Sequence, residues 1–487
     1  MTSNSKPYAS LARPLVFRSL TEDEISLLHE ASLEIMVCTG IRFYEQEALD
    51  LFKKAGASIS DGNLVRVPHH VVEWAMRTAP KNVTIYTRDG LRMMALGGYR
   101  SYFGVGSDCM YIYDVHNGER RRAVLEDVRC GARLVDALPN ISFVMSMFMP
   151  HDVPVETYER HQMAVMLLET RKPIVFVGTD LSSTVDTIEM AAIVAGGLDT
   201  LLSKPSVINY VNVTGPLQHN KEGVQRLLYA AERNLPTIYL PGAKRGIDTP
   251  ITAAGAMAMG NAGQLAGLVL SQLKREGSPF IRGNPAWGEL DLSLMTSLYV
   301  SPGPIRPAGW DLAHHYGLPI FGTAGCSDAK VFDAQAAGEA SLSILSHAIS
   351  GANLVHDIGY LDCAMTGSLE LVAFCDEIIE WVRRYLLKVE ISEETLALDL
   401  IDEIGPDGSF LESEHTLRHV REEWRPKLID RRSYQRWFER GATTLQERAN
   451  QKVLQILETH HPEPFPEDVV AAVQAVVRRA DQRLSGR

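Results

Sequence analysis

Eight short apolar runs recur along the chain from about residue 99, and they constrain its fold more than any other feature. They lie roughly 30 to 40 residues apart, and most of the stretches between them carry a helical pattern. Strands that alternate with helices form parallel sheets, because each helix carries the chain back before the next strand begins. The expected strands are Ser101–Val105, Ser142–Met149, Pro173–Gly178, Ser206–Val213, Pro236–Pro241, Pro279–Gly283, Leu318–Gly322 and Asn353–Asp357.

Eight β/α units predict an α/β fold, a (β/α)8 TIM barrel, over residues 99–368. An open doubly wound sheet is the alternative, but Gly104-Val105-Gly106 lacks the third glycine of a dinucleotide-binding turn. We expect a mostly helical cap over residues 1–98 and a helical region packing on the barrel over residues 369–487. The cap begins at a capping box, Thr21 to Glu24, and contains a hairpin around Asp89-Gly90. The C-terminal helices are expected at Ser392–Ile404, Glu412–Trp424, Ser433–Thr459 and Pro466–Leu484.

Charge and composition exclude several classes of function. The net charge of -12 argues against binding to nucleic acid or to an anionic membrane surface. The uncharged stretch Thr249–Leu273 contains glycines, Asn261 and glutamines, so a buried helix is a better interpretation than a membrane span. The N-terminus shows no signal-peptide core, and the six cysteines form no CxxC pair. We therefore expect a cytoplasmic protein with reduced thiols. Large barrels with helical additions often pair, so we also expect a homo-oligomer.

Reactive side chains gather after the last two expected strands. In barrels and other parallel folds the chemistry lies on the loops at the carboxyl ends of the strands. Any one of these residues is more often structural, and for Cys326 a small buried thiol is the default interpretation over a nucleophile or metal ligand. We expect no metal in this chain. The residues are Cys326, Asp328, Lys330 and Asp333 after the seventh strand, and His356, Asp357, Tyr360 and Asp362 after the eighth.

Three stretches resemble the trimethylamine methyltransferase family, and the resemblance covers roughly residues 20–480. It implies a (β/α)8 barrel with extra helices. It also implies transfer of a methyl group from a methylated amine to the Co(I) of a separate corrinoid protein, so cobalamin is carried by that partner and no cofactor binds tightly here. The stretches are SYFGVGSDCMYIYD, INYVNVTGPLQHN and GTAGCSDAKVFDAQAAGEASLSILSHAISGANLVHDIGYLD.

The chain is written wholly in ordinary residues, so it resembles the branch of the family that lacks pyrrolysine. That branch demethylates quaternary amines, of which glycine betaine is the best known. A quaternary nitrogen leaves as a neutral tertiary amine and needs no general acid. The protein must then position the N–CH3 bond and bind a cation that cannot donate hydrogen bonds, a task that suits aromatic faces.

We assign candidate residues from their positions at the strand ends. The candidates for substrate binding comprise aromatic residues for the cation, and Arg282 with His356 (or Lys244) for a betaine carboxylate. Asp328, Asp333 and Asp357 would orient loops or balance charge. The candidate catalytic residues are His356, Asp328 and Asp357, and the aromatic candidates are Tyr102, Phe103, Trp287, Trp310 and Tyr360.

Two other functions stay open at this point. A metal-assisted barrel lyase or hydrolase would use Asp328, His356 and Asp357 as ligands, and stoichiometric metal in the purified protein would favour it. A catalytically silent betaine-binding protein would bind betaine without transferring its methyl group to a competent Co(I) partner.

Overall fold

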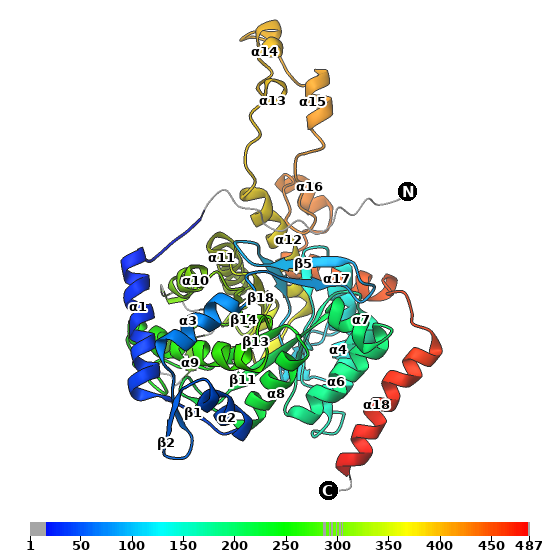
Figure 1. Cartoon of the computed structure of the whole chain (residues 1–487). Coiled ribbons are helices and arrows are strands. Elements are labelled where there is room, and N and C mark those ends of the chain that lie inside the picture. Colours follow the sequence, from blue (N-terminus) through cyan, green and yellow to red (C-terminus); the bar gives the residue numbers. More distant parts are fainter. Residues whose placement is uncertain are drawn as a thin grey trace.

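Two four-stranded parallel sheets form the centre of the molecule (Figure 1). The computed structural model describes residues 16–285, 289–291, 293, 296–298, 300, 303 and 305–485. One sheet has the order β10-β11-β13-β14 and the other β17-β18-β6-β9. The strands are β6 (Tyr102–Gly104), β9 (Ile141–Phe143), β10 (Ile174–Val177), β11 (Val207–Val213), β13 (Thr237–Pro241), β14 (Phe280–Arg282), β17 (Phe321–Thr323) and β18 (Leu354–His356).

These strands lie where the sequence predicts them, with two changes of extent. β9 ends at Phe143, six residues before the predicted end at Met149. β17 begins at Phe321, three residues after the predicted start at Leu318. Two isolated parallel bridges, Val144 to Ile174 and Arg282 to Ile320, connect the two sheets at both sides.

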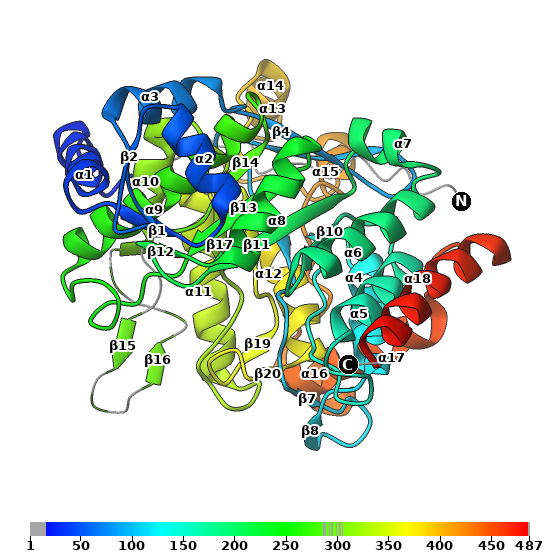
Figure 2. The same ribbon diagram turned by 60° about the horizontal axis from the view of Figure 1, so that its bottom comes forward.

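Helices follow the central strands in regular alternation and cover them from outside (Figure 2). Their apolar faces and those of the strands form a large buried cluster, because both faces of a parallel sheet are covered. The helices are α4 (Leu125–Ala137), α5 (Tyr158–Glu169), α6 (Leu181–Val194), α7 (Leu198–Ser203), α8 (Lys221–Glu232), α9 (Ala253–Lys274), α10 (Ile305–Tyr316), α11 (Ala334–Ser350) and α12 (Leu369–Tyr385).

A separate apolar cluster joins side chains of both sheets with the hairpin β4 (Val83–Tyr86) and β5 (Arg92–Leu96). This is the hairpin that the sequence predicts around Asp89-Gly90. Its strand β5 contacts Tyr102, the first residue of β6. The hairpin therefore covers the amino ends of the strands and leaves the carboxyl ends free for a site.

The N-terminal region contains three predicted helices and one sheet that the sequence did not predict. The capping box of Thr21 and Glu24 is formed. Because its strands have only two or three residues each, the sheet β12-β1-β3-β2 has no clear alternation in the sequence. The elements are α1 (Glu22–Glu34), the π-helical turn η1 (Ile35–Thr39), α2 (Gln46–Lys54), α3 (His69–Thr78), β1 (Ile41–Phe43), β2 (Ser58–Ser60), β3 (Leu64–Arg66) and β12 (Gln218–His219).

Two small strand groups border the carboxyl ends. A turn at Asn117-Gly118 joins β7 to β8, and these two strands extend a sheet with β20 and β19. The elements are β7 (Tyr111–Tyr113), β8 (Arg120–Arg122), β19 (Tyr360–Leu361), β20 (Thr366–Gly367) and the hairpin β15 (Glu289–Asp291) with β16 (Thr296–Leu298).

The C-terminal helices are shorter than predicted. The first predicted helix is interrupted at Ala397, which has a φ of 47°, and the third is interrupted around Gly441 and Ala442, which also have positive φ. The resulting elements are α13 (Glu393–Leu396), α14 (Leu398–Ile404), α15 (Glu414–His419), α16 (Tyr434–Glu439), α17 (Leu445–Thr459) and α18 (Glu467–Ser485).

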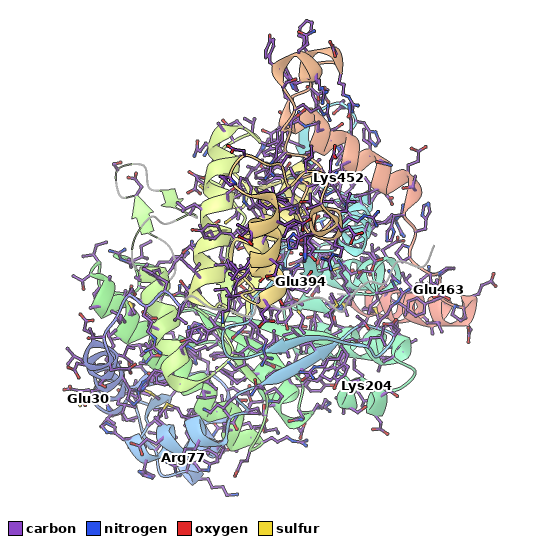
Figure 3. All side chains as sticks on the ribbon, turned by 90° about the horizontal axis from the view of Figure 1, so that it is seen from above. Glu30, Arg77, Lys204, Glu394, Lys452 and Glu463 are labelled. Atoms are coloured by element: carbon purple, nitrogen blue, oxygen red, sulfur yellow. The ribbon has the colours of Figure 1, made fainter. Side chains whose placement is uncertain are left out.

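Residues 387–424 form an arm that rises from the body and carries α13, α14 and α15 (Figure 1). In the view from above, Glu394 of the arm overlies the body, while Glu30 and Arg77 of the N-terminal helices lie to one side (Figure 3). The predicted helix within Thr249–Leu273 is α9. Its length and composition would suit a membrane span, but 78% of its most apolar window is buried inside the molecule.

Candidate functional site

His356 and Asp357 form a buried pair at the carboxyl end of β18. His356 Nδ1 lies 2.8 Å from the carbonyl oxygen of Gly322, so Nδ1 carries the proton that this bond needs. Its Nε2 faces Asp357 Oδ2 at 3.2 Å, which requires a further proton shared by the two groups. Burial lowers the pKa of His356, while the Asp357 carboxylate and the Gly322 carbonyl oppose that shift. In this geometry the imidazole and the carboxylate therefore share one proton.

Gly106 allows Asp357 and Tyr360 to approach the loop after β6. An added Cβ at Gly106 would lie 2.1 Å from Asp357 Oδ1 and 2.4 Å from the Tyr360 hydroxyl oxygen. That hydroxyl donates a short hydrogen bond to the carbonyl oxygen of Ser107. Asp357 has a positive φ of 75°, a conformation that Asp tolerates better than most residues. The backbone after β6 and after β18 therefore leaves space for the Asp357 carboxylate.

Tyr210 of β11 and Asp108 complete the same region from other strands. Tyr210 is half-buried, and its ring centroid lies 6.4 Å from that of His356 and 5.6 Å from that of Phe321. Burial raises the pKa of Tyr210 most, and the carboxylates of Asp357 and Asp108 raise it further, so the phenol stays neutral. Desolvation raises the pKa of Asp108 to about 6. Asp108 also has a positive φ, 70°.

The start of α5 brings in Tyr158 and Glu159. Burial raises the pKa of Tyr158 and the carboxylates of Asp108 and Glu159 add to that rise. Glu159 is buried; its Oε1 accepts hydrogen bonds from Thr179 Oγ1 at 2.6 Å and from Arg160 Nη1 at 2.8 Å. Its other oxygen, Oε2, is buried without a hydrogen-bond partner among the residues that the structure describes. A carboxylate oxygen without a hydrogen-bond partner is costly to bury in a protein core.

We give the name strand-end cluster to six of the residues described above. It combines two half-buried phenols, an imidazole and three carboxylates, with Arg226 behind it. Phenol faces and carboxylates are groups with which proteins can attract a cation. Its members are Asp108, Tyr158, Glu159, Tyr210, His356 and Asp357.

Two predicted aromatic residues lie outside this cluster. Tyr102 faces the apolar cluster shared by the sheets, but its hydroxyl accepts a hydrogen bond from the backbone N–H of Ala95, at the amino ends of the strands. Phe103, its neighbour, points to the opposite face and packs in the cluster beneath the helices. We predicted both residues at the carboxyl ends of the strands, and this placement is wrong. Membership of a predicted strand does not show whether a side chain lies near the amino end or the carboxyl end of the sheet.

Arg282 and Trp310 also point away from the strand-end cluster. The Arg282 guanidinium is buried against α9, where Nε donates to Gln264 Oε1 and Nη2 donates to Asn261 Oδ1, both at 2.9 Å. The Trp310 ring packs edge-on against His347 of α11 and beside Gly322. Both side chains hold helices onto strands rather than line a site at the strand ends. Trp287 lies outside the described residues.

Asp328 lies in the loop after β17 and is held there by hydrogen bonds with Val300 and Glu339. Asp328 Oδ2 accepts from the N–H of Val300 at 3.2 Å, and its own N–H donates to Glu339 Oε2. Among the described residues, Asp328, His356 and Asp357 do not gather as a three-ligand metal group. Asp333 caps α11, as expected for a loop-orienting residue. Burial raises the pKa of the Cys326 thiol well above its usual range, which favours the inert interpretation.

Asp108, Tyr158, Glu159 and Tyr210 are not among the candidate site residues that we predicted from the sequence. Tyr210 lies in the middle of a run, Val207–Val213, that has Asn209 on one face and Asn212 on the other, so no polar–apolar alternation marks the direction of its side chain. Tyr158 and Glu159 begin a helix, where polar residues are ordinary. A useful signal would have been the helix start that follows each strand, since those residues also lie at the carboxyl edge.

Comparisons with known proteins agree with the resemblance found in the sequence. The family described as trimethylamine methyltransferase (MTTB) matches residues 3–485. A trimethylamine methyltransferase MttB of Desulfitobacterium hafniense is 30% identical over 465 residues, which cover 95% of this chain and 93% of that relative. A glycine betaine methyltransferase of the same species is 29% identical over 476 residues, covering 96% and 98%.

One solved structure shares the fold. The crystal structure of the hydroxylamine MtmB complex matches with a TM-score of 0.50 and 12% sequence identity, covering 91% of this chain and 88% of that one. At this identity the likeness extends to the arrangement of helices and strands alone.

Proposed function

We propose that this chain, which belongs to the trimethylamine methyltransferase family, transfers a methyl group from a quaternary amine to the Co(I) of a separate corrinoid protein. The observation that carries the proposal is the strand-end cluster, a cation-attracting set of phenols and carboxylates where parallel strands end. The relatives named for trimethylamine and for glycine betaine support a methylated amine as the donor. Glycine betaine is the donor we favour.

We also propose that the eight central strands close into a (β/α)8 barrel. The two parallel bridges support this, because Val144–Ile174 joins β9 to β10 and Arg282–Ile320 joins β14 to β17. With these two junctions the strand order becomes circular. A closed barrel directs all eight carboxyl ends to one opening, which is where barrel enzymes hold their sites.

The quaternary nitrogen would rest against the Tyr210 ring. A phenol face attracts such a cation by about 0.5–2 kcal/mol. The carboxylates of Asp108, Glu159 and Asp357 add a negative field. The cation loses its charge as the methyl group leaves, so binding that is too tight in the ground state would slow the reaction. Below pH 6 the Asp108 carboxyl is mostly protonated and neutral, which weakens the attraction of the strand-end cluster for the cation.

The reaction needs little from the protein besides position. The electron pair of Co(I) forms the Co–CH3 bond, the C–N bond breaks, and its electrons stay on the nitrogen as a lone pair. The products are methyl-Co(III) and a neutral tertiary amine. No proton is transferred, so the His356–Asp357 pair would fix the shape of the site through its contacts with Gly322 and Gly106.

A betaine carboxylate needs a cation, and Arg306 replaces Arg282 as our candidate. Arg306 is half-buried near the start of α10, its Nη1 donates to the Thr323 carbonyl oxygen at 2.9 Å, and its charge lowers the pKa of His356. It therefore lies within electrostatic reach of the strand-end cluster. Arg282 is held on the other side of β14 by Asn261 and Gln264.

A Co(I) methylation assay tests the proposed reaction. The purified protein is mixed with reduced cobalamin, or with the cognate corrinoid protein, and with a panel of amines. We expect conversion of Co(I) to methyl-Co(III) with glycine betaine, and no conversion with trimethylamine. Conversion with trimethylamine alone would replace the quaternary donor by a tertiary one, and no conversion with any amine would remove the proposed function.

Arg306→Met tests the carboxylate anchor separately. The variant should raise the KM for glycine betaine at least tenfold and leave the KM for choline, which has no carboxylate, unchanged. An equal rise for both donors would show that Arg306 acts on the site as a whole and not on the carboxylate.

A further inference from the structure

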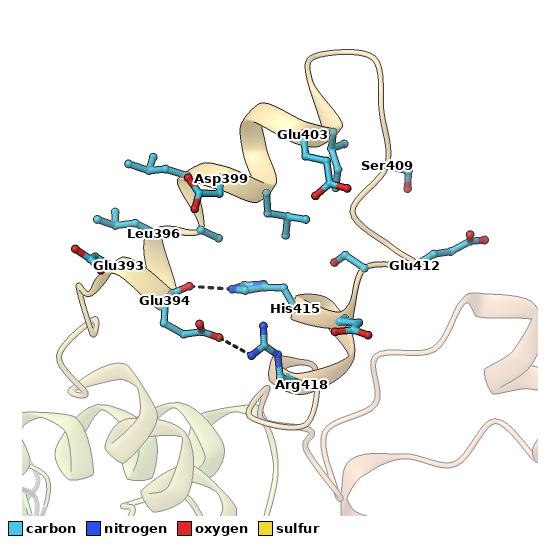
Figure 4. A pocket seen from close by; sticks show the side chains of 15 residues that line it. Glu393, Glu394, Leu396, Asp399, Glu403, Ser409, Glu412, His415 and Arg418 are labelled. Atoms are coloured by element: carbon cyan, nitrogen blue, oxygen red, sulfur yellow. Dashed lines mark hydrogen bonds and ion pairs between the residues drawn. The ribbon is translucent and has the colours of Figure 1, made fainter.

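Two histidines one helical turn apart on the arm lie close to a glutamate from another helix. Figure 4 shows one of them, His415, opposite Glu394. His415 and His419 lie on α15, and their ring centroids are 4.4 Å apart. Glu394 lies on α13, with Oε1 at 3.5 Å from His419 Nε2. One ligand atom from each of the three residues lies within 4.8 Å of the others. This arrangement is separate from the strand-end cluster.

We propose that Glu394, His415 and His419 bind a divalent transition-metal ion, of which Zn2+ is the best match, and that the ion joins α13 to α15. Two imidazoles and a carboxylate are ligands that Zn2+ accepts in tetrahedral sites. Bonds of about 2.1 Å place two such ligands about 3.4 Å apart. The distance of 3.5 Å between Glu394 Oε1 and His419 Nε2 fits that spacing.

A second carboxylate orients one of the ligands. Glu422 Oε2 lies 3.1 Å from His419 Nδ1, which leaves Nε2 directed at Glu394. Metal-binding histidines commonly donate their other ring N–H to a carboxylate in this way. Arg418 Nη1 contacts the same oxygen, Glu394 Oε1, at 3.1 Å. A carboxylate has about four lone-pair sites, so Glu394 can accept from Arg418 and bind the ion through a second lone pair of Oε1 or through Oε2.

The arm also needs a stabilising link. None of residues 387–424, all of which the structure describes, is buried, so the arm has no apolar core of its own. It contains no cysteine, which excludes a disulfide. Segments below about 40 residues usually require a disulfide, a metal or association to hold one structure. His415 Nε2 lies 3.2 Å from the backbone oxygen of Glu394, a weak link that a metal bond would strengthen.

Calorimetric titration of the full-length protein with ZnCl2 tests the site, after chelator treatment and dialysis. We expect one tight Zn2+ site in the wild type and no comparable site for Mg2+. His415→Ala should abolish that site and Glu394→Gln should weaken it at least tenfold. The control His69→Ala/His70→Ala, which removes two exposed histidines of α3, should bind as the wild type does.

The glutamate variant is the decisive one. An exposed pair of histidines on one helix can hold zinc weakly without a third ligand, so unchanged affinity in Glu394→Gln would overturn the proposal. Failure of the wild type to bind Zn2+ would overturn it as well.

Amide hydrogen exchange provides a second readout that does not depend on enzyme activity. Zinc should slow exchange across residues 393–419 in the wild type and in the His69→Ala/His70→Ala control, and not in Glu394→Gln. Zinc binding with unchanged exchange in the wild type would show that the ion does not join the two helices.

Discussion

Replacing Gly106 by alanine is the perturbation whose consequences the structure defines most closely. The new methyl group would lie 2.1 Å from Asp357 Oδ1 and 2.4 Å from the Tyr360 hydroxyl oxygen. Asp357 cannot turn away freely, because its other oxygen contacts His356 Nε2 at 3.2 Å. Tyr360 is held by its hydrogen bond to Ser107. The substitution therefore acts directly on the candidate site.

The size of the effect follows from the displacement. Ordinary contact begins at 3.4 Å, so the Asp357 oxygen must move by about 1.3 Å. Overpacking of this kind costs about 1–3 kcal/mol of unfolding free energy. A misplacement of about 1 Å near reacting groups lowers the rate about 100-fold. We expect kcat/KM for methyl transfer to fall by about two orders of magnitude in Gly106→Ala.

Gly338→Ala is the matched control. Gly338 is exposed in the middle of α11, and no described atom lies within 4 Å of an added Cβ. Alanine should stabilise that helix by about 0.5–1 kcal/mol and leave activity unchanged. The assay measures kcat/KM from the rate of Co(I) methylation and stability from denaturant unfolding. Wild-type activity in Gly106→Ala would refute the placement of the site between Gly106 and Asp357.

Three further predictions concern single side chains. Tyr210→Leu should raise the KM for the quaternary amine about 2- to 30-fold, the equivalent of about 0.5–2 kcal/mol of cation–π attraction. Tyr210→Phe keeps the ring and should keep most of the affinity. An equal loss of affinity in both variants would contradict a role for the ring face. The pKa of Asp108 is about 6 in the folded protein and 3.8 unperturbed, so the stability that its protonated form contributes is complete below pH 4 and is lost as pH rises through 6. Asp108→Asn should therefore be more stable than the wild type in denaturant unfolding at pH 8, with the difference vanishing near pH 4, and a pH-independent difference would count against the raised pKa. Arg282→Ala should lower the unfolding free energy by about 2–4 kcal/mol, because Asn261 and Gln264 lose the hydrogen bonds that Arg282 donates. The KM for the amine should stay unchanged. A raised KM with unchanged stability would show that Arg282 belongs to the binding site.

The sequence located the central strands well because each is a compact apolar run bounded by turn residues. Thr21 and Glu24 marked the first helix through a capping box, and Asp89-Gly90 marked the hairpin. The interruptions of the C-terminal helices were not visible, because Ala397 is a good helix former that nevertheless adopts a φ of 47°. At this position the tertiary structure outweighs the helix propensity of alanine.

Side-chain direction was the part that the sequence could not supply. Strands covered on both faces have no polar side, so Tyr102 and Phe103 looked alike although they face opposite layers. The same ambiguity hid Tyr210. His356, Asp357 and Tyr360 were located at one edge because they lie at the carboxyl end of β18 or just after it, and not in the middle of that strand. Their proximity to Gly106 depends on the neighbouring order of β18 and β6, which only the fold reveals.

A single-turnover experiment with methyl-labelled glycine betaine tests the central claim most directly. Wild-type protein, the reduced corrinoid partner and 13C-methyl betaine are combined, and labelled methyl-Co(III) and dimethylglycine are quantified by mass spectrometry. The account predicts that the two products form in equal amounts, and that Gly106→Ala forms both about 100-fold more slowly. Dimethylglycine formed without labelled methyl on cobalt, or no demethylation at all, would contradict it.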